Sequence, residues 1–589
     1  MQKCGKIKRR KKMKIKLLSL VLAVIACMTL LASCGPTGNG GNGEGNGEGN
    51  GTGNGNGNGD YNYTWAQTEV LFEMNEHGNG GELTSGVRRY YAGADVDKVD
   101  DIDNAIRQRN KDAANNSNVK PKYTYLADGV KEYNWGSNVG RIQQLTNVGG
   151  SNCPDVFVNH SYDLTSAQIR GCFANLLDTT WAQGNYFYFA NNEIPATTDY
   201  FDSKAGEGYF YEYMKSLSLT PDTKIYCLGS NYCVDLVRAF LVIPVNVNLM
   251  NSITTTETKD GLAGDRDGDG DHDIVDFYNL VWNNEWTYDA LAAYSNAIFV
   301  GNNRESDNTD FADDVIGFVL GTNSGMQGAA MLYTTSVKII NYNETTGKYE
   351  YPATNADLTA FAKALSDLML QNASKGICTV NKAEVNEYDS SASSELMGIR
   401  NKFAADGILF SAPVMVGSLE DAEYQEMRKG AGFGVVPVPL YKAYDANTNF
   451  YQTLVHNIAR IVAVAKCSTE KSQASAYLDY VSRNSADILD EYYTVQLASA
   501  VSGGEAGANN NKMLTYIRNH VRTCFDKTFE DSIADYMLET DSGAYGKRWH
   551  YMLQTEKFSM PTISTQYEAY YLEKQRNLDL IYAQWNTLD

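Results

Sequence analysis

Six aspartates between residues 265 and 276 have the spacing of a calcium-binding loop. They occupy loop positions 1, 3, 5, 7, 9 and 12 and are Asp265, Asp267, Asp269, Asp271, Asp273 and Asp276. Gly270 stands at position 6, where an EF-hand-type loop turns sharply, and the oxygens of such a loop meet the needs of Ca²⁺ for about 6–8 hard ligands. Because six like charges this close repel one another without a cation, we predict a structural Ca²⁺ site. The alternative is a solvated acidic loop.

The rest of the chain shows no catalytic signature. It has six His, contains neither HExxH nor GxSxG, and shows no Ser/His/Asp order that stands out. Acidic pairs suited to glycoside hydrolysis occur, as in any acidic chain, and do not discriminate. We therefore expect no enzyme, with a glycan-degrading enzyme as the weaker alternative.

The first 34 residues have the parts of a bacterial export signal. Nine Lys or Arg precede an apolar run at 17–31, which ends in Leu31-Ala32-Ser33-Cys34. This ending resembles the lipobox of bacterial lipoproteins, so we predict cleavage after residue 33 and lipidation (palmitate) of Cys34. The alternative is an uncleaved membrane anchor, but the apolar run is shorter than the roughly 20 residues that a spanning helix needs.

The composition after the leader is typical of an acidic folded region on a flexible tether. Residues 34–64 are largely Gly and Asn, which behave as a flexible linker and cannot bury a core. The formal charge is −21, with 71 acidic against 50 basic residues, and the leader contains nine of the basic ones. So acidic a chain is unsuited to nucleic acid or anionic lipid. We expect a monomer on the outer face of the cell membrane.

Seven cysteines follow Cys34: Cys153, Cys172, Cys227, Cys233, Cys378, Cys467 and Cys524. An odd number leaves at least one unpaired. Cys227 and Cys233 are close enough to pair across a turn, or they are two separate buried thiols.

Strand-like and helix-like segments alternate along the chain, which predicts an α/β fold with a mainly parallel sheet. Predicted strands are 69–75, 86–91, 122–126, 155–159, 224–228, 239–247, 315–320, 408–410, 433–438 and 458–465. Predicted helices are 97–115, 139–146, 166–177, 274–282, 286–299, 327–332, 357–371, 468–481, 488–497, 512–526 and 565–588.

The order of four motifs resembles that of the carbohydrate-type extracellular solute-binding proteins (family 1) of bacterial ABC importers, in their lipoprotein form. The motifs are NNEWTYD at 283–289, KFAADGILF at 402–410, GVVPVPLY at 434–441 followed by Tyr451-Gln452-Thr453, and the helix pair 468–481 and 490–497. The resemblance implies a two-lobed periplasmic-binding-protein-like (type II) fold whose hinge strands cross near 226–238 and 404–416. It implies lobe 1 at 65–236 and 405–467, lobe 2 at 237–404 with a calcium-loop insertion at 260–277, and a helical region at 468–589 that packs on the lobes.

The resemblance also implies a ligand held between the lobes, beyond the carboxyl ends of strands. Polar and aromatic side chains suited to sugar hydroxyls and C–H faces follow the predicted strands. The candidates are Asn159, His160, Tyr162, Asp163, Ser230, Asn231, Tyr232, Asn323, Ser411 and Met415, with Trp135, Trp181 and Trp549 as aromatic platforms. The implied function is capture of an oligosaccharide by hinge closure and delivery to permease subunits. The alternative is a glycan-binding adhesion lipoprotein without a transporter.

Overall fold

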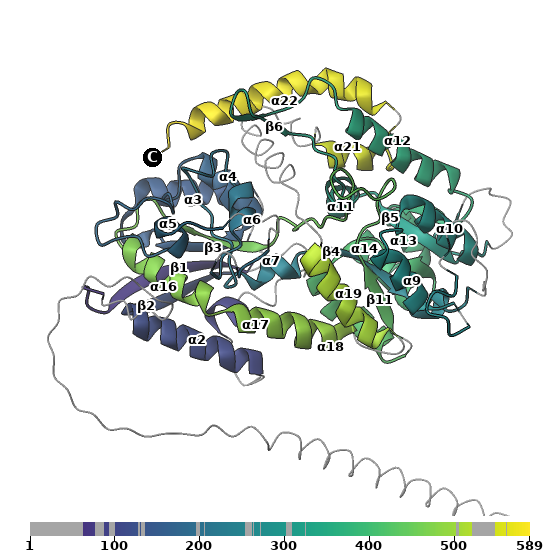
Figure 1. The fold of residues 1–589 in the computed structure, drawn as a ribbon, viewed down its shortest axis with the longest axis horizontal. Helices are drawn as coiled ribbons and strands as arrows, with labels where there is room; N and C mark the ends of the chain where they lie inside the picture. Colours follow the sequence, from purple (N-terminus) through teal and green to yellow (C-terminus); the bar gives the residue numbers. More distant parts are fainter. Residues whose placement is uncertain are drawn as a thin grey trace, which may run out of the picture. The chain divides into compact units, whose positions relative to one another are not determined.

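Two separate β-sheets, each with helices packed on it, organise the chain in the computed structural model (Figure 1). The structure describes residues 63–588 except 77–87, 94–100, 128–129, 131–135, 196–200, 205–206, 254–261, 263, 271, 302–308, 324, 431, 502–505, 521–547 and 561. Within these residues, no helix combines the length and the apolar character needed to cross a membrane.

The first sheet has the strand order β12-β3-β1-β2. Its strands are β1 (Thr68–Asn75), β2 (Val119–Leu126), β3 (Val156–His160) and β12 (Arg460–Val464). β1 is parallel to both β2 and β3, whereas β12 is antiparallel to β3 with Val462 opposite Val158. The parallel pairs need crossover connections, which contain α2 (Asp101–Ser117) and α3 (Ser137–Val148). β3 is buried along its whole length, as expected of an inner strand.

The second sheet has the order β10-β4-β9-β5-β8, and β11 also pairs with β4. Its strands are β4 (Leu241–Asn246), β5 (Ile316–Gly321), β8 (Ile377–Val380), β9 (Ile408–Phe410), β10 (Val414–Met415) and β11 (Phe433–Val436). β5 is parallel to β8 and β9, while β4 is antiparallel to β9, β10 and β11. α12 (Ala356–Gln371) and α14 (Glu395–Ala404) supply the crossovers between the parallel strands.

The chain passes from the first sheet to the second between α7 (Val234–Arg238) and β4, close to the predicted crossing at 226–238. The return is later than predicted. The resemblance places residues 405–467 in lobe 1, but β9, β10 and β11 within this range are hydrogen-bonded in the second sheet. The return therefore falls between Val436 and Arg460. Strands of two to four residues carry no local signal of which sheet they join.

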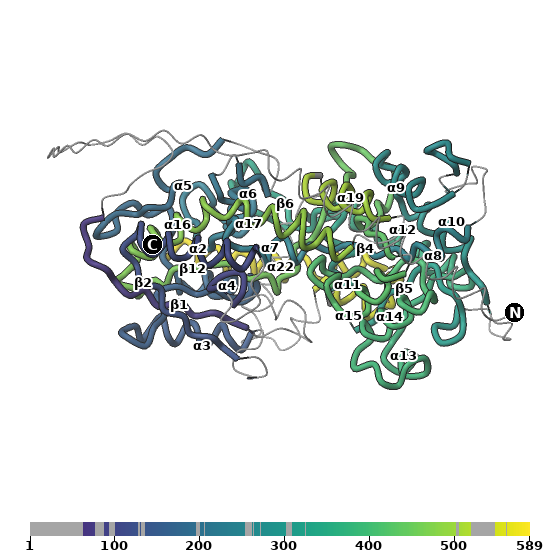
Figure 2. Tube along the Cα trace, turned by 90° about the horizontal axis from the view of Figure 1, so that it is seen from below, coloured from purple at the N-terminus to yellow at the C-terminus, as the bar shows by residue number. Residues whose placement is uncertain are grey.

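Helices of the C-terminal region pack on elements of both sheets. They are α16 (Lys471–Arg483), α17 (Ala486–Glu491), η6 (Tyr492–Leu497), α18 (Ala498–Val501), α19 (Gly507–His520), α21 (Trp549–Thr555) and α22 (Ile563–Trp585). α16 lies beside α2 and against β1 (Figure 2), whereas α19 packs on β11. α22 contacts α12 at one part and α4 (Ser161–Ile169) at another, and Figure 1 shows it as the long yellow helix.

Two predicted strands are wrong. Residues 88–92 form a π-helical turn, η2 (Arg88–Ala92), whose Tyr90 and Tyr91 are buried. Residues 224–228 form no strand and make a single antiparallel bridge, Leu228 with Val462. Tertiary packing of aromatic and apolar side chains decides the backbone at such short segments. α4 begins at Ser161, directly after β3, earlier than the predicted helix at 166–177.

The remaining elements are a separate two-stranded antiparallel sheet and further helices and helical turns. They are η4 (Gly150–Asn152), α5 (Tyr188–Asn191), α6 (Tyr211–Ser216), α8 (Val247–Met250), α9 (Ile274–Trp282), α10 (Tyr288–Ile298), α11 (Gly325–Tyr333), β6 (Asn341–Asn343), β7 (Lys348–Glu350), α13 (Lys382–Tyr388), η5 (Val416–Glu420) and α15 (Ala422–Arg428).

Candidate functional site

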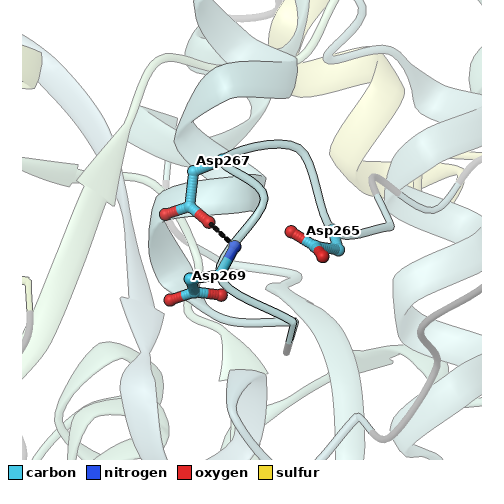
Figure 3. Close-up of side chains that lie close together, drawn as sticks. All are labelled: Asp265, Asp267 and Asp269. Carbon is cyan, nitrogen blue, oxygen red and sulfur yellow. Dashed lines mark hydrogen bonds between the residues drawn. The ribbon is translucent and has the colours of Figure 1, made fainter.

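Three of the loop aspartates form an exposed carboxylate cluster. One oxygen from each of Asp265, Asp267 and Asp269 lies within 4.8 Å of the others. Figure 3 shows these three side chains around the turn, with the hydrogen bond from Asp269 N–H to Asp267 Oδ1 at 3.2 Å. Since Ca–O bonds are about 2.3–2.6 Å, two ligands on opposite sides of one ion are about 5 Å apart. The cluster therefore has the dimensions of a Ca²⁺ site.

The charges of this cluster oppose one another. The hydrogen bond from Asp269 N–H lowers the pKa of Asp267, but desolvation and the negative charges of Asp269, Asp276 and Asp273 outweigh it. As a result, the pKa of Asp267 is raised above its usual value. A bound cation would remove this repulsion.

The other two described aspartates hold the loop on the start of α9. The buried Asp276 carboxylate accepts backbone N–H groups of Arg266 (2.5 Å), Asp267 (3.2 Å) and Asp273 (3.1 Å). Asp273 is the N-cap of α9 and accepts from Val275 N–H at 2.7 Å, so that Asp273 and Asp276 form a capping box. Asp271 lies outside the described residues. The predicted helix after the loop is confirmed.

Side chains of the 265–276 loop contact residues next to and within α10. Arg266 forms an ion pair with Glu285, and the buried His272 ring places Nε2 3.1 Å from the hydroxyl of Tyr294 in α10. Burial lowers the pKa of His272, which favours the neutral ring. The loop is therefore part of the packing of α9 and α10.

The candidate residues at the end of β3 form one buried network. Asn159 Oδ1 accepts hydrogen bonds from Asn75 Nδ2 (2.9 Å) and from the backbone N–H of His160 (2.8 Å). His160 Nδ1 lies 3.2 Å from Asp163 Oδ2, and Asp163 also accepts from Gly136 N–H at 3.1 Å. All three side chains are at most 1% exposed. In this conformation they shape the turn from β3 into α4.

Tyr162 connects this turn to the C-terminal helices. Its hydroxyl accepts a hydrogen bond from Arg548 Nη2 at 3.4 Å, and the Arg548 guanidinium lies 5.8 Å from the Tyr162 ring centroid. Trp549 follows at the start of α21 and stacks on Tyr567 with ring centroids 5.3 Å apart. The predicted Tyr162 thereby contacts the residue that precedes the predicted Trp549, although Tyr162 and Trp549 are 387 positions apart in the sequence.

α21 also contacts a helix that follows a strand of the second sheet. It packs on α11, the helix that follows β5, and the His550 ring lies 5.8 Å from that of Tyr333. Residues that follow the carboxyl ends of β3 and β5 therefore both contact the start of α21, through Arg548 and His550. Arg548 and His550 were not predicted, because neither stands in a motif or beside another polar candidate in the sequence.

The candidates at 230–232 lie in the buried turn before α7. Ser230 Oγ accepts from Ser482 Oγ at 2.9 Å, and Tyr232 donates its hydroxyl to Tyr91 O at 3.4 Å beneath the Arg109 guanidinium. Among the described residues, the buried Oδ1 of Asn231 has no hydrogen-bond partner. A buried polar atom of this kind calls for a water or a ligand.

The remaining candidates are dispersed. Asn323 is exposed after β5 and donates its backbone N–H to Glu395 at 2.9 Å. Ser411 and Met415 are fully buried in the second sheet, and Trp181 packs edge-on against Phe187 in the first-sheet unit. The structure does not group these four with Tyr162. Trp135 and Cys34 lie outside the described residues.

Cys227 and Cys233 are two separate buried thiols. Cys227 Sγ lies 3.5 Å from Gln168 Oε1, and Cys233 Sγ lies 3.7 Å from the Leu228 carbonyl. Burial raises the pKa of each.

No protein-family model matches the sequence, and no curated protein matches it. Solved structures do match this chain. The galacto-N-biose/lacto-N-biose I-binding protein of the ABC transporter from Bifidobacterium longum is 10% identical over 88% of this chain and 98% of its own, with a TM-score of 0.45. A family 1 extracellular solute-binding protein from B. longum subsp. infantis is 12% identical (88% and 100% covered, TM-score 0.42). Maltose-bound MalE3 of T. maritima is 10% identical (87% and 100% covered, TM-score 0.42). By their descriptions, these three solved structures are a sugar-binding protein of an ABC transporter, a family 1 extracellular solute-binding protein and a maltose-bound protein.

Proposed function

We propose that this protein is a carbohydrate-binding receptor that captures its ligand without altering it. The observation that carries the proposal is the meeting of two sheet units at α21. Polar segments follow the carboxyl ends of β3 and β5, which is where ligands bind in α/β sheets. Arg548 contacts Tyr162 on one side, and His550 contacts Tyr333 on the other.

The chemistry of these side chains suits a sugar. Tyr and Trp offer apolar ring faces together with a polar group, and Arg548 offers hydrogen-bonding groups for hydroxyls. A ligand that contacts elements of both units would favour the conformation in which they are closest, because it gains contacts only there. The ligand class that we propose is an oligosaccharide.

The cellular setting belongs to the same proposal. A lipid on Cys34 and the Gly/Asn-rich segment after it would tether the receptor near the permease subunits of an ABC importer. Tethering raises the effective concentration of the receptor at its transporter.

Thermal unfolding with a panel of oligosaccharides tests the binding function. A ligand present at about 100 times its Kd adds about 2.7 kcal/mol to the free energy of unfolding. The sugar is then recovered and analysed. Stabilisation with intact sugar supports the receptor, whereas turnover, or no stabilisation by any glycan tried, would contradict it.

A conservative variant locates the site. Tyr162→Phe removes the hydroxyl that meets Arg548 and keeps the ring, so we expect the Kd to rise about fivefold or more by calorimetry, since one hydrogen bond contributes about 0.5–1.5 kcal/mol and one to a charged group more. Tyr123→Phe is the matched control, because its hydroxyl contacts Tyr477 between β2 and α16. Equal Kd values for both variants would exclude the site at Tyr162.

We also propose that the 265–276 loop binds Ca²⁺ in a structural role. The support is the twelve-residue spacing together with the three carboxylates whose oxygens lie within 4.8 Å of one another. The backbone hydrogen bonds to Asp276 and Asp273 already form the turn, so that an ion would complete the loop rather than fold it.

Chelation tests this site. We expect EGTA to lower the melting temperature of the wild type, and excess Ca²⁺ to restore it, while Asp265→Ala plus Asp269→Ala abolishes the response. The matched control, Asp367→Ala plus Glu426→Ala, removes two acids that pair with Lys363 and Lys429 on exposed helix surfaces. A wild type insensitive to EGTA contradicts the proposal, as does a response that the loop variant retains.

A further inference from the structure

We propose that Cys153 and Cys467 form a disulfide bond in the exported protein. Their Sγ atoms lie 2.7 Å apart, closer than the sulfurs of two unconnected thiols normally approach. The two residues are 314 positions apart in the sequence, so neither has a nearby partner that would reveal the pair. This crosslink is independent of the ligand and of Ca²⁺.

The strand register places the two cysteines opposite each other. β3 and β12 are antiparallel with Val156 opposite Val464, and the pairing continues one residue further through Ala465 N–H to Asp155 O at 2.8 Å. Continuing the same register brings Cys153 opposite Cys467. The two cysteines thus stand opposite each other at the end of a regular antiparallel strand pair, and this backbone geometry supports a bond between them.

The Asp155 side chain fixes this end of the sheet. Asp155 Oδ2 accepts the backbone N–H of Leu71 in β1 at 2.8 Å, and Asp155 Oδ1 accepts Ser468 Oγ–H at 2.6 Å. The residue beside Cys467 is therefore hydrogen-bonded to the residue two positions after Cys153. This contact holds the backbone segments that carry the two cysteines together.

The electrostatics favour reaction at Cys467. The hydrogen bond between the two thiols lowers the pKa of Cys467, and the same contact raises the pKa of Cys153. Cys467 is also the more exposed of the two. It is therefore the thiolate that meets an external oxidant first.

The bond forms by thiol–disulfide exchange with a disulfide of a small molecule or of an oxidising protein. The Cys467 thiolate attacks one sulfur of that disulfide, which breaks its S–S bond and releases one thiolate. Cys153 then loses its proton and attacks Cys467 Sγ, releasing the second thiolate. The two protein thiols give up two protons and two electrons, and the oxidant leaves as two thiols.

The other described cysteines lack such a partner geometry. Cys172 is close by, since its carbonyl accepts the backbone N–H of Lys466 at 2.9 Å, but burial raises the pKa of its thiol to about 11. Burial likewise raises the pKa of Cys378. Cys172 is thus the competing thiol that an experiment must distinguish.

Peptide mapping of the full chain tests the bond. Protein oxidised with glutathione disulfide is denatured, alkylated and digested with trypsin without reduction. The expected product is peptide 142–170 joined to peptide 467–471, lighter than their sum by two hydrogen atoms. Cys172 is on the separate peptide 171–204, and Cys227 and Cys233 share peptide 225–238. Alkylation of both Cys153 and Cys467, or a link to peptide 171–204, overturns the proposal.

Melting with and without reductant is the second measurement. We expect reduction to lower the melting temperature of the wild type by about 5 °C or more, because an open chain gains freedom in the unfolded state. Cys153→Ser should melt like the reduced wild type in both conditions, and Cys172→Ser should keep the response to reductant. If Cys153→Ser does not fold, the mapping of the wild type still decides. A wild type whose melting ignores the reductant contradicts the crosslink.

Discussion

Arg460 and Asp235 form a buried ion pair where the chain leaves and re-enters the first sheet. Arg460 Nη1 in β12 lies 3.6 Å from Asp235 Oδ2 in α7, and both side chains are fully buried. Asp235 Oδ1 also accepts from Arg238 Nη1 at 3.0 Å. One carboxylate therefore balances two buried guanidinium groups next to the crossing into β4. This pair connects the two segments that link the sheets.

Removal of this carboxylate should be costly. We expect Asp235→Ala to lower the free energy of unfolding by about 3–5 kcal/mol, because the buried Arg460 loses this counter-charge and Arg238 is left with Glu420 at 3.4 Å. Urea denaturation monitored by circular dichroism measures it. Asp367→Ala, whose exposed partner is Lys363, should change the free energy of unfolding by less than about 1 kcal/mol. Equal effects of the two substitutions would show that the buried pair has no special role.

Asp479 makes stability depend on pH. Burial raises its pKa to about 6, although the Tyr209 hydroxyl (2.5 Å) and Tyr188 N–H (2.9 Å) donate to its Oδ1. Because the folded protein then binds this proton more tightly than the unfolded chain, the contribution of Asp479 to stability falls as pH rises from about 4 to 6.

Asp479→Asn should therefore gain stability relative to the wild type as pH rises, by up to roughly 3 kcal/mol between pH 4 and 7. The amide oxygen still accepts both hydrogen bonds. Urea denaturation at a series of pH values measures the difference. Tyr209→Phe is the complementary variant: it removes a hydrogen bond that lowers the pKa, so the fall should shift to higher pH. A difference between Asp479→Asn and the wild type that stays constant with pH would refute this assignment.

Two glycines should respond in opposite directions to alanine. At Gly317 in β5 an added Cβ would meet Ser295 Cα of α10 at 2.1 Å, and we expect Gly317→Ala to destabilise by about 1–3 kcal/mol or more. Gly140 is exposed in α3 with nothing within 4 Å, and Gly140→Ala should stabilise by about 0.5–1 kcal/mol. Thermal unfolding of both variants checks the close contact between α10 and β5, and a mild effect at Gly317 would show that α10 can move away.

Asp273 separates helix capping from metal binding. As N-cap of α9 it accepts from Val275 N–H at 2.7 Å, so Asp273→Ala should cost about 1 kcal/mol even in EGTA. Asp273→Asn keeps the cap and removes the charge, and in EGTA it should melt close to the wild type. If the two variants differ only when Ca²⁺ is present, the side chain acts on the ion and not on the helix.

Much of the local structure could be predicted from the sequence. Periodic apolar residues located β1, β3, β4, α2 and α12 within a few residues, and the acidic spacing located the loop before α9. Two predictions failed where neighbouring elements decide the backbone: Arg88–Ala92 is a π-helical turn around Tyr90 and Tyr91, and β9 to β11 belong to the second sheet. Of the candidate ligand residues, Asn159, His160 and Asp163 share the network after β3, and Tyr162 in the same turn contacts Arg548, which precedes Trp549.

The sequence by itself determined features that depend on short spacing: the positions of the loop aspartates, and most helices and strands, because periods of about 2 and 3.6 residues are local properties. It also predicts a leader that ends in Cys34. Only the tertiary structure decided which distant residues meet. Cys153 and Cys467, Arg460 and Asp235, and Tyr162 and Arg548 are each paired by strand register and helix packing. Such contacts depend on how the whole chain buries its apolar surface, and no local pattern encodes them.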